Sequence, residues 1–152
     1  MSAEEWIDDV ARLWAFEGHS GLMVKSYLQD EFPESINYFP CAISYIAGLD
    51  PSYSIAGPLD DLYWGVTEFH LFPSASKAFM PEVNRYYAKI RNAAASRMTL
   101  GGKVARFELR RTSGPPISRA FELTYGIENP HLGLLVMWEV KEIVVGDYTP
   151  AA

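Results

Sequence analysis

Hydrophobic residues recur every three or four positions near the N-terminus, the spacing that places side chains on one buried face of an α-helix. The residues with this spacing are Trp6, Val10, Leu13 and Trp14. Ser2 and Glu5 have the spacing of a capping box, in which each side chain bonds a backbone amide at the start of a helix. The run Gly18-His19-Ser20-Gly21 interrupts the pattern. We therefore predict an N-terminal helix that ends at this run.

Three strands are predicted in the part of the chain that follows. Residues 22–28 form a short candidate, and residues 41–47 form an apolar one. In residues 62–71 the side chains alternate with a period of two, as expected for a strand, and both sets are largely apolar, which places this strand inside the sheet. The pairs Asp50-Pro51 and Gly57-Pro58 favour turns, so a loop is expected over residues 49–59.

A second helix is predicted to begin between Ser76 and Pro81 and to end before Gly101-Gly102. Its apolar stripe consists of Phe79, Val83, Tyr86, Tyr87, Ile90 and Ala94. Pro81 is tolerated in the first turn of a helix, and Gly101-Gly102 suits the left-handed conformation that ends one. Strands are then expected over residues 104–111 and 118–125, joined as a hairpin by a Gly-Pro-Pro turn, and over residues 132–145.

This order of elements predicts an α+β fold with a mainly antiparallel sheet, an N-terminal helix and one long central helix packed on it. At 152 residues, with 49% hydrophobic and 14% aromatic side chains, the chain fits one domain and is too apolar for wholesale disorder. We expect this domain over residues 1–145 and a loose tail over 146–152. No apolar run approaches 18 residues, and the acidic start lacks the regions of a signal peptide, so neither a membrane segment nor secretion is expected.

Candidate chemistry is sparse, and we expect no catalytic residue, no metal ligand and no bound cofactor. Cys41 lies in an apolar run and is interpreted as a small buried hydrophobe. His70 and Glu68 share a strand face at a spacing that suits a divalent metal or an acid–base pair, but no third ligand is near them in the sequence. His19 lies in a loop flanked by glycines, and His131 follows Asn129-Pro130 in a predicted turn. A polar pair that is exposed or at the edge of the core is the preferred interpretation of His70 and Glu68.

The formal charge of −6 is distributed unevenly along the chain. Residues 1–70 carry a balance of −10, residues 71–119 a balance of +8, and the last 33 residues a balance of −4. Such segments often neutralise each other within a fold. If they also separate in space, they favour head-to-tail association of subunits. The residues that we assign to such an interface are Arg106, Arg110, Arg111 and Arg119 on the basic side and Asp8, Asp9, Asp60 and Asp61 on the acidic side.

The basic residues around 103–119 also suggest a second interpretation, since they alternate with Phe107 and Phe121 as in proteins that bind single-stranded nucleic acid. However, the isoelectric point is about 5.0, against the usual basic character of such proteins. Arg106 and Arg110 fall on the opposite strand face from Lys103, so no single basic stripe forms. We therefore favour a solvated strand pair or one that contacts the acids of a neighbouring subunit.

From residue 39 to 144 the chain resembles tail terminator proteins of long-tailed bacteriophages. The matching features are Phe39-Pro40-Cys41-Ala42-Ile43, the strand at 66–72, the helix at 81–98, Leu100-Gly101-Gly102-Lys103-Val104, and His131-Leu132-Gly133-Leu134 through Val140-Lys141-Glu142. The resemblance implies a non-enzymatic ring, commonly a hexamer, that caps the tail tube and joins it to the head connector or stopper protein. The genome would pass through its lumen without sequence-specific binding. The protein would belong to the virion and assemble in the host cytoplasm.

A different class of function remains open from the sequence. An α+β domain with one helix over a curved sheet can form a cone-shaped pocket for a small molecule, with or without enzymatic activity. The aromatic residues that would line it are Tyr45, Tyr63, Trp64 and Trp138. Core packing is the ordinary role of such residues. A particle of six times 17.1 kDa would favour the ring, and a monomer or dimer the binding domain.

Overall fold

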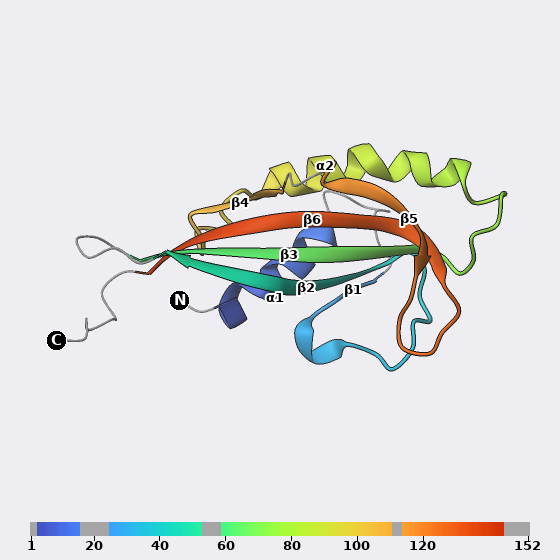
Figure 1. Cartoon of the computed structure of the whole chain (residues 1–152), viewed down its shortest axis with the longest axis horizontal. Helices are drawn as coiled ribbons and strands as arrows, with labels where there is room; N and C mark the ends of the chain where they lie inside the picture. The colour runs from blue at the N-terminus through green and yellow to red at the C-terminus, as the bar shows by residue number, and fades with distance from the viewer. Residues whose placement is uncertain (1–2, 16–24, 53–58, 111–113, 145–152) are drawn as a thin grey trace.

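The computed structural model describes residues 3–15, 25–52, 59–110 and 114–144. Two helices lie against one face of a twisted six-stranded sheet, in the order that the sequence predicts (Figure 1). The elements are α1 (Ala3–Trp14), β1 (Lys25–Tyr27), η2 (Gln29–Glu31), β2 (Cys41–Ser52), β3 (Leu59–Phe72), η3 (Pro81–Arg85), α2 (Tyr86–Ser96), β4 (Arg106–Leu109), β5 (Ile117–Leu123) and β6 (His131–Val144). The predicted α+β class with a mainly antiparallel sheet is confirmed.

Helix α1 forms where the periodic stripe predicts it, with Glu4 and Glu5 in the first turn near the positive end of the helix dipole. Trp6 and Trp14 are fully buried. The indole Nε1 of Trp6 donates a hydrogen bond of 2.8 Å to the Oε2 atom of buried Glu142 on β6. The helix is therefore fixed both by its apolar stripe and by one buried polar contact. Ser2 and the run 18–21, which we assigned to its two ends, lie outside the described residues.

The sheet has the strand order β1-β2-β3-β6, with β3 at its centre. Strand β1 is parallel to β2 and pairs only with residues 41–43, whereas β2, β3 and β6 are antiparallel over most of their lengths. The loop expected over residues 49–59 is wrong for residues 49–52 and 59, because β2 continues through a bulge after Ile46 to Ser52, pairs Pro51 with Asp61, and β3 begins at Leu59; residues 53–58 lie outside the described residues. Since no strand pairs with the other edge of β2 at this point, the missing N–H group of Pro51 is tolerated.

The hairpin expected between residues 104–111 and 118–125 is wrong. Strands β4 and β5 do not pair with each other; both pair antiparallel with β6, β4 along residues 138–141 and β5 along residues 131–136. The two strands therefore run in the same direction, one after the other, along a single edge of β6. The physical reason is the length of β6, whose 14 residues offer one edge that is long enough for both.

The predicted central helix begins as the short helix η3, with Pro81 in its first turn, and continues as α2. Val83, Tyr86 and Ile90 of the predicted stripe are buried, and Phe79 and Tyr87 pack against the same core at its margin. The segment that follows α2 turns at Gly101 and Gly102, whose φ angles are +74° and +87°. Glycine adopts this left-handed conformation without a Cβ clash.

One hydrophobic core fills the space between the helices and the sheet. It is formed by the stripes of α1 and α2 and by alternate residues of the strands, including Phe69, Phe107, Leu134, Val136 and Trp138, all fully buried. We call this side of the sheet the inner face, and the opposite side the outer face. No helix in the described part of the chain is long and apolar enough to cross a membrane.

Candidate functional site: the outer face of the sheet

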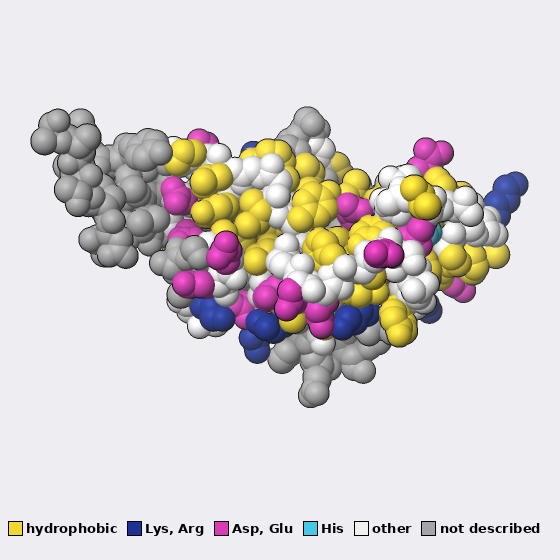
Figure 2. Space-filling view, turned by 90° about the horizontal axis from the view of Figure 1, so that it is seen from below, with side chains coloured by type: hydrophobic (Ala, Val, Ile, Leu, Met, Phe, Trp, Pro, Cys, Tyr) yellow, Lys and Arg dark blue, Asp and Glu magenta, His cyan; other side chains and the backbone are white. Residues whose placement is uncertain are grey.

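No α-helix of the described residues covers the outer face, and the centre of this face is apolar. The side chains on this face, taken from the strand register and the alternation along each strand, include Tyr45 on β2, Leu62, Trp64 and Val66 on β3, and Leu135 and Met137 on β6. All but Val66 are partly exposed. Figure 2 looks onto this side of the molecule and shows a broad hydrophobic area with acidic side chains in and around it.

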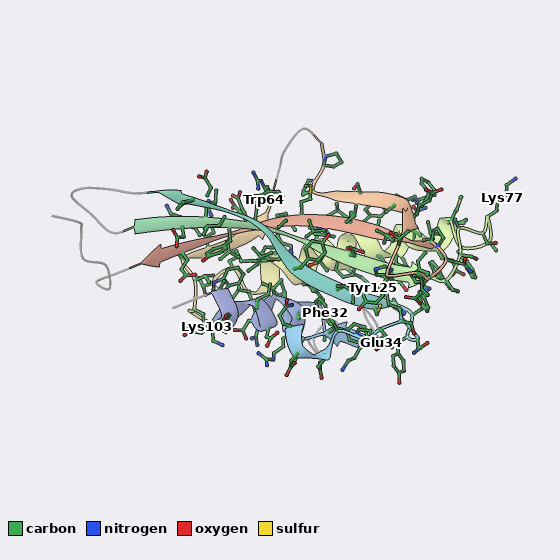
Figure 3. The ribbon with its side chains drawn as sticks, turned by 60° about the horizontal axis from the view of Figure 1, so that its bottom comes forward. Phe32, Glu34, Trp64, Lys77, Lys103 and Tyr125 are labelled. Carbon is green, nitrogen blue, oxygen red and sulfur yellow. The ribbon has the colours of Figure 1, made fainter. Side chains whose placement is uncertain are left out.

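Trp64 occupies the middle of this area (Figure 3). Its indole lies over Gly48 of the neighbouring strand, where a Cβ atom would come within 2.2 Å of Nε1. The guanidinium carbon of Arg110 lies 4.8 Å from the ring centroid, within the range of a cation–π interaction. The missing side chain of Gly48 thus leaves room for the indole against β2, and the guanidinium of Arg110 packs on the ring. One guanidinium nitrogen of Arg110, Nη1, is buried without a hydrogen-bond partner among the described residues.

Charged side chains border the apolar centre on its β4 side. Glu108 and Glu139 face each other across β4 and β6, and Arg106 lies 3.2 Å from the first and 3.7 Å from the second. Burial and the neighbouring Glu108 carboxylate raise the pKa of Glu139, and the nearby Arg106 and Arg110 partly oppose this. Asp50, on β2, is an exposed acid on the opposite side of the apolar centre. Lys141 and Arg106 lie in the same row as Asp50, so acidic and basic groups both border the patch.

At the other end of the outer face, a hydrogen-bonded chain links Glu68, His70 and His131. The Glu68 Oε1 atom lies 3.1 Å from His70 Nε2, and the two Nδ1 atoms of the histidines are 2.9 Å apart. Because the carboxylate accepts a hydrogen bond from Nε2–H, the Nδ1 atom of His70 accepts a hydrogen bond from the Nδ1–H of His131 when both rings are neutral. Burial, followed by the proximity of His70, lowers the pKa of His131. The two histidines thus form a buried polar contact between β3 and β6.

The sequence predicts the Glu68–His70 contact but not its continuation to His131, which we had placed in a turn. His131 is in fact the first residue of β6 and is 4% exposed. The only signal for it in the sequence is its position, two residues before Gly133 in the alternating pattern of the last strand. No group of three or more His, Cys, Asp or Glu side chains among the described residues is placed to hold a metal ion.

Cys41 and Tyr45 lie on the same face but are not activated for chemistry. Burial, reinforced by the carboxylates of Glu128 and Glu68, raises the pKa of the Cys41 thiol to about 12. Burial and the adjacent Glu68 raise the pKa of Tyr45 to about 12 as well. Because the thiolate is the nucleophilic form of cysteine, Cys41 at neutral pH is an inert buried residue, as its sequence context indicates.

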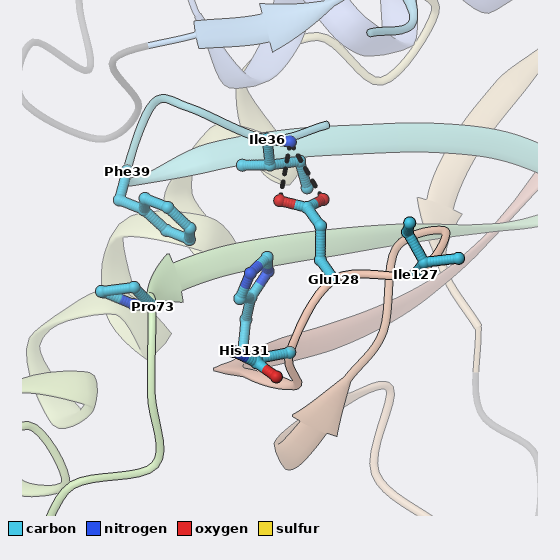
Figure 4. Close-up of a pocket in the computed structure, with 7 residues that line it drawn as sticks. Ile36, Phe39, Pro73, Ile127, Glu128 and His131 are labelled. Carbon is cyan, nitrogen blue, oxygen red and sulfur yellow. Dashed lines mark hydrogen bonds between the residues drawn. The ribbon is translucent and has the colours of Figure 1, made fainter. Parts of the chain in front are cut away.

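A groove of about 400 Å³ opens beside His131, between the segments 36–39 and 127–131 (Figure 4). Its residues are Ile36, Phe39, Pro73, Ile127, Glu128, Asn129 and His131. Both carboxylate oxygens of Glu128 accept a hydrogen bond of 3.0 Å from the same backbone N–H group, that of Ile36. The hydroxyl of Tyr125 donates to the carbonyl of Pro33 and joins the same two segments. The groove is thus bordered by contacts that join two loops.

The four aromatic residues proposed for a small-molecule pocket lie on opposite faces of the sheet. Tyr63 and Trp138 point into the inner core, where their ring centroids lie 5.3 and 6.1 Å from that of Trp6. Tyr45 and Trp64 lie on the outer face. These residues therefore do not line a common cavity, and the space beneath the helices is filled by core side chains.

The basic residues that we assigned to an interface lie on the β4–β5 side of the sheet. Arg106 and Arg110 lie on the outer face, as described above, whereas Arg119 belongs to β5 and donates a 2.7 Å hydrogen bond to Asn84. Arg111 lies outside the described residues. The described arginines of this set thus already contact side chains of their own subunit.

The acidic residues of the assigned interface lie elsewhere. On α1, Asp9 forms a 2.6 Å ion pair with Lys103, and Asp8 accepts a hydrogen bond from the backbone N–H of Gln29. Asp61 is partly exposed near the start of β3, and the side chain of Asp60 is outside the description. The contact between Asp9 and Lys103 shows that the acidic first segment and the basic middle segment are partly paired within one chain.

No protein-family model matches this chain, and none of the curated proteins compared with it does so either.

Proposed function

We propose that this protein is a non-enzymatic structural subunit that assembles with copies of itself into a ring, as tail terminator proteins of long-tailed bacteriophages do. The observation that carries the proposal is the contrast between the two faces of the sheet. The inner face is filled by both helices, whereas the outer face leaves aromatic and aliphatic side chains partly exposed around Trp64. An apolar area rimmed by charged groups is typical of a protein interaction site.

The order of elements supports the same proposal. The helix, three strands, second helix and three further strands follow the order that underlies the resemblance to tail terminators. The final strand, which begins with His131-Leu132-Gly133-Leu134, lies beside the central strand β3 and takes both β4 and β5 on its other edge. The strands that carry the resemblance therefore belong to one continuous sheet.

In this role a ring of six copies caps the tail tube. It contacts the tube protein on one side and the head connector or stopper protein on the other, and it leaves a lumen for the genome. The net charge of −6 disfavours adhesion of DNA to the subunit. The proposal requires no cofactor. Its setting is the neck of the virion, assembled in the host cytoplasm.

The proposal is tested by the mass and shape of the purified protein over a range of concentrations. Sedimentation velocity distinguishes a closed particle near six times 17.1 kDa from a chain that stays monomeric or dimeric. Electron microscopy of the heavier species then distinguishes a ring from a compact cluster. A protein that remains monomeric at all concentrations, and that also fails to bind the end of a purified tail tube, contradicts the proposal.

A further inference from the structure

We infer that the exposed side of helix α2 is a contact surface for the phosphate backbone of double-stranded DNA. Four cations carry the inference, Arg85, Lys89, Arg91 and Arg119, and we call them the basic face. Helix α2 runs along one border of the molecule, and the acidic helix η2 lies at the opposite border (Figure 1). In the proposed ring the basic face would point toward the lumen, but the contact itself needs only one subunit.

The arginines of the basic face are held by neutral groups. The Nη2 atom of Arg119 donates a 2.7 Å hydrogen bond to the side-chain oxygen of Asn84. Arg91 donates two hydrogen bonds, of 3.3 and 3.2 Å, to the side-chain oxygen of Asn92. Among the described residues, no carboxylate forms an ion pair with any member of the basic face. Their positive charges are therefore not neutralised by direct contact, and each arginine keeps further N–H donors.

Other cations on the described surface differ in this respect. Four of them form an ion pair with a carboxylate of their own subunit: Arg12, Lys25, Lys103 and Arg106. Helix α2 itself contains no acid. The neighbouring elements η3, β4 and β5 carry one acid each, Glu82, Glu108 and Glu122, and Glu108 is already paired with Arg106. Positive charge therefore predominates around α2.

The cations lie on both flanks of α2. Lys89 and Arg91 are two positions apart, which is about 200° around a helix, so they project from opposite flanks. Arg85 precedes Lys89 by four positions and shares its flank. Asn84, which accepts the hydrogen bond from Arg119, precedes Arg91 by seven positions and shares the other flank. Each flank thus carries two cations.

The middle of the exposed side, between the two flanks, carries small side chains. These are Ala88, Asn92 and Ala95, and all three are exposed. A helix with its side chains is about 10–12 Å wide, and the major groove of B-DNA is about 12 Å wide with phosphates along both edges. The helix therefore fits the groove with cations at each edge. Because the Asn92 oxygen already accepts from Arg91 and the alanines offer no hydrogen bond, we expect no base-specific contact.

The composition of this surface favours DNA over a protein partner. Protein interfaces usually have an apolar core with few charges, whereas interfaces with DNA are more polar and much more positive. The exposed side of α2 carries no large apolar side chain, and Met98 lies beyond its C-terminal end. Tyr86 is buried and Tyr87 partly buried, so α2 presents no fully exposed ring on which unpaired bases could stack. A duplex is therefore favoured over a single strand.

Fluorescence anisotropy with a labelled duplex of about 24 base pairs and mixed sequence tests the inference. The net charge of −6 opposes binding, so we expect weak binding that depends strongly on salt. With four phosphate contacts, the affinity should fall by about fiftyfold between roughly 20 and 60 mM salt, a logarithmic slope of about −3.6. A single strand of the same length should bind at least about threefold more weakly than the duplex.

The variant Lys89→Gln with Arg91→Gln removes two of these contacts and keeps residues that favour a helix. We expect its affinity at about 20 mM salt to fall by at least about tenfold, and the magnitude of its salt slope to decrease by about 2. Lys89→Arg keeps the charge and should bind as the wild type does.

A matched control, Arg12→Gln with Lys25→Gln, removes the same amount of charge from α1 and β1, where both cations are paired with acids. We expect this control to bind the duplex within about twofold of the wild type. Circular dichroism and thermal unfolding of all variants separate loss of folding from loss of contact.

Three results would overturn the inference. The first is no binding of the duplex by the folded wild type at about 20 mM salt, and the second is an equal loss in the α2 variant and the control. The third is weaker self-association of the α2 variant with unchanged DNA binding, which would assign the basic face to an acidic protein surface.

Sedimentation of the same samples separates the inference from the proposed function. A ring that does not bind the duplex overturns the DNA contact and leaves the ring intact. A subunit that binds the duplex through α2 but never assembles, in solution or on a tube end, overturns the ring and supports the DNA contact.

Discussion

Two neighbouring leucines of β6 provide a direct test of the difference between the two faces of the sheet. Leu134 is fully buried on the inner face, and Leu135 is partly exposed on the outer face. Replacing a buried leucine with alanine removes its burial and leaves a cavity, so Leu134→Ala should lower the free energy of unfolding by about 3–5 kcal/mol. Leu135→Ala removes only partial burial and should cost about 1.5 kcal/mol or less.

The two variants share residue type and strand, so the difference between them reports the face alone. We expect urea unfolding, followed by tryptophan fluorescence at low protein concentration, to separate them by at least about 1.5 kcal/mol. In thermal unfolding, Leu134→Ala should lower the midpoint by about 6–20 °C, given roughly 2–4 °C per kcal/mol for a chain of this size. Equal costs, or a larger cost at Leu135, would refute the assignment of the inner and outer faces.

Three further predictions concern buried polar groups. Burial and His70 lower the pKa of His131 below its usual 6.5. The unfolded state therefore takes up the proton first, and the stability of the fold should decrease as the pH drops below about 6.5. His131→Phe should reduce this pH dependence when thermal unfolding is measured between pH 5 and 8. Trp6→Phe leaves the buried Glu142 without its N–H donor and should cost about 1–3 kcal/mol in urea unfolding, more than Glu142→Gln, which keeps an acceptor. Calorimetric titration with zinc, nickel or manganese should give no saturable heat, and micromolar binding that His70→Ala abolishes would reverse the non-enzymatic interpretation.

The helices and the two long central strands were predictable because their signals are local. The stripe of α1 and the alternation in β3 and β6 each reflect one buried face in a single segment. The pairing of β4 and β5 was not predictable in this way. A turn containing Gly-Pro-Pro favours a hairpin locally, but the free edge of the 14-residue strand β6 accepts both strands in succession. Tertiary pairing decided against the local signal.

The candidate site was less accessible to sequence reasoning than the fold. Alternation assigns Trp64 and Tyr63 to opposite faces of a strand, but it does not indicate which face the helices cover. The contact between His70 and His131 joins residues 61 positions apart, and no periodicity links them.

The central claim is that copies of this chain assemble into a ring around a channel. Cryo-electron microscopy of the purified protein, concentrated or bound to the end of a tail tube, tests it most directly. The account predicts symmetric particles near six times 17.1 kDa around a central channel, with the outer face around Trp64 covered by an adjacent subunit. A lone subunit with an open outer face, with a small molecule in the groove beside His131, would contradict it.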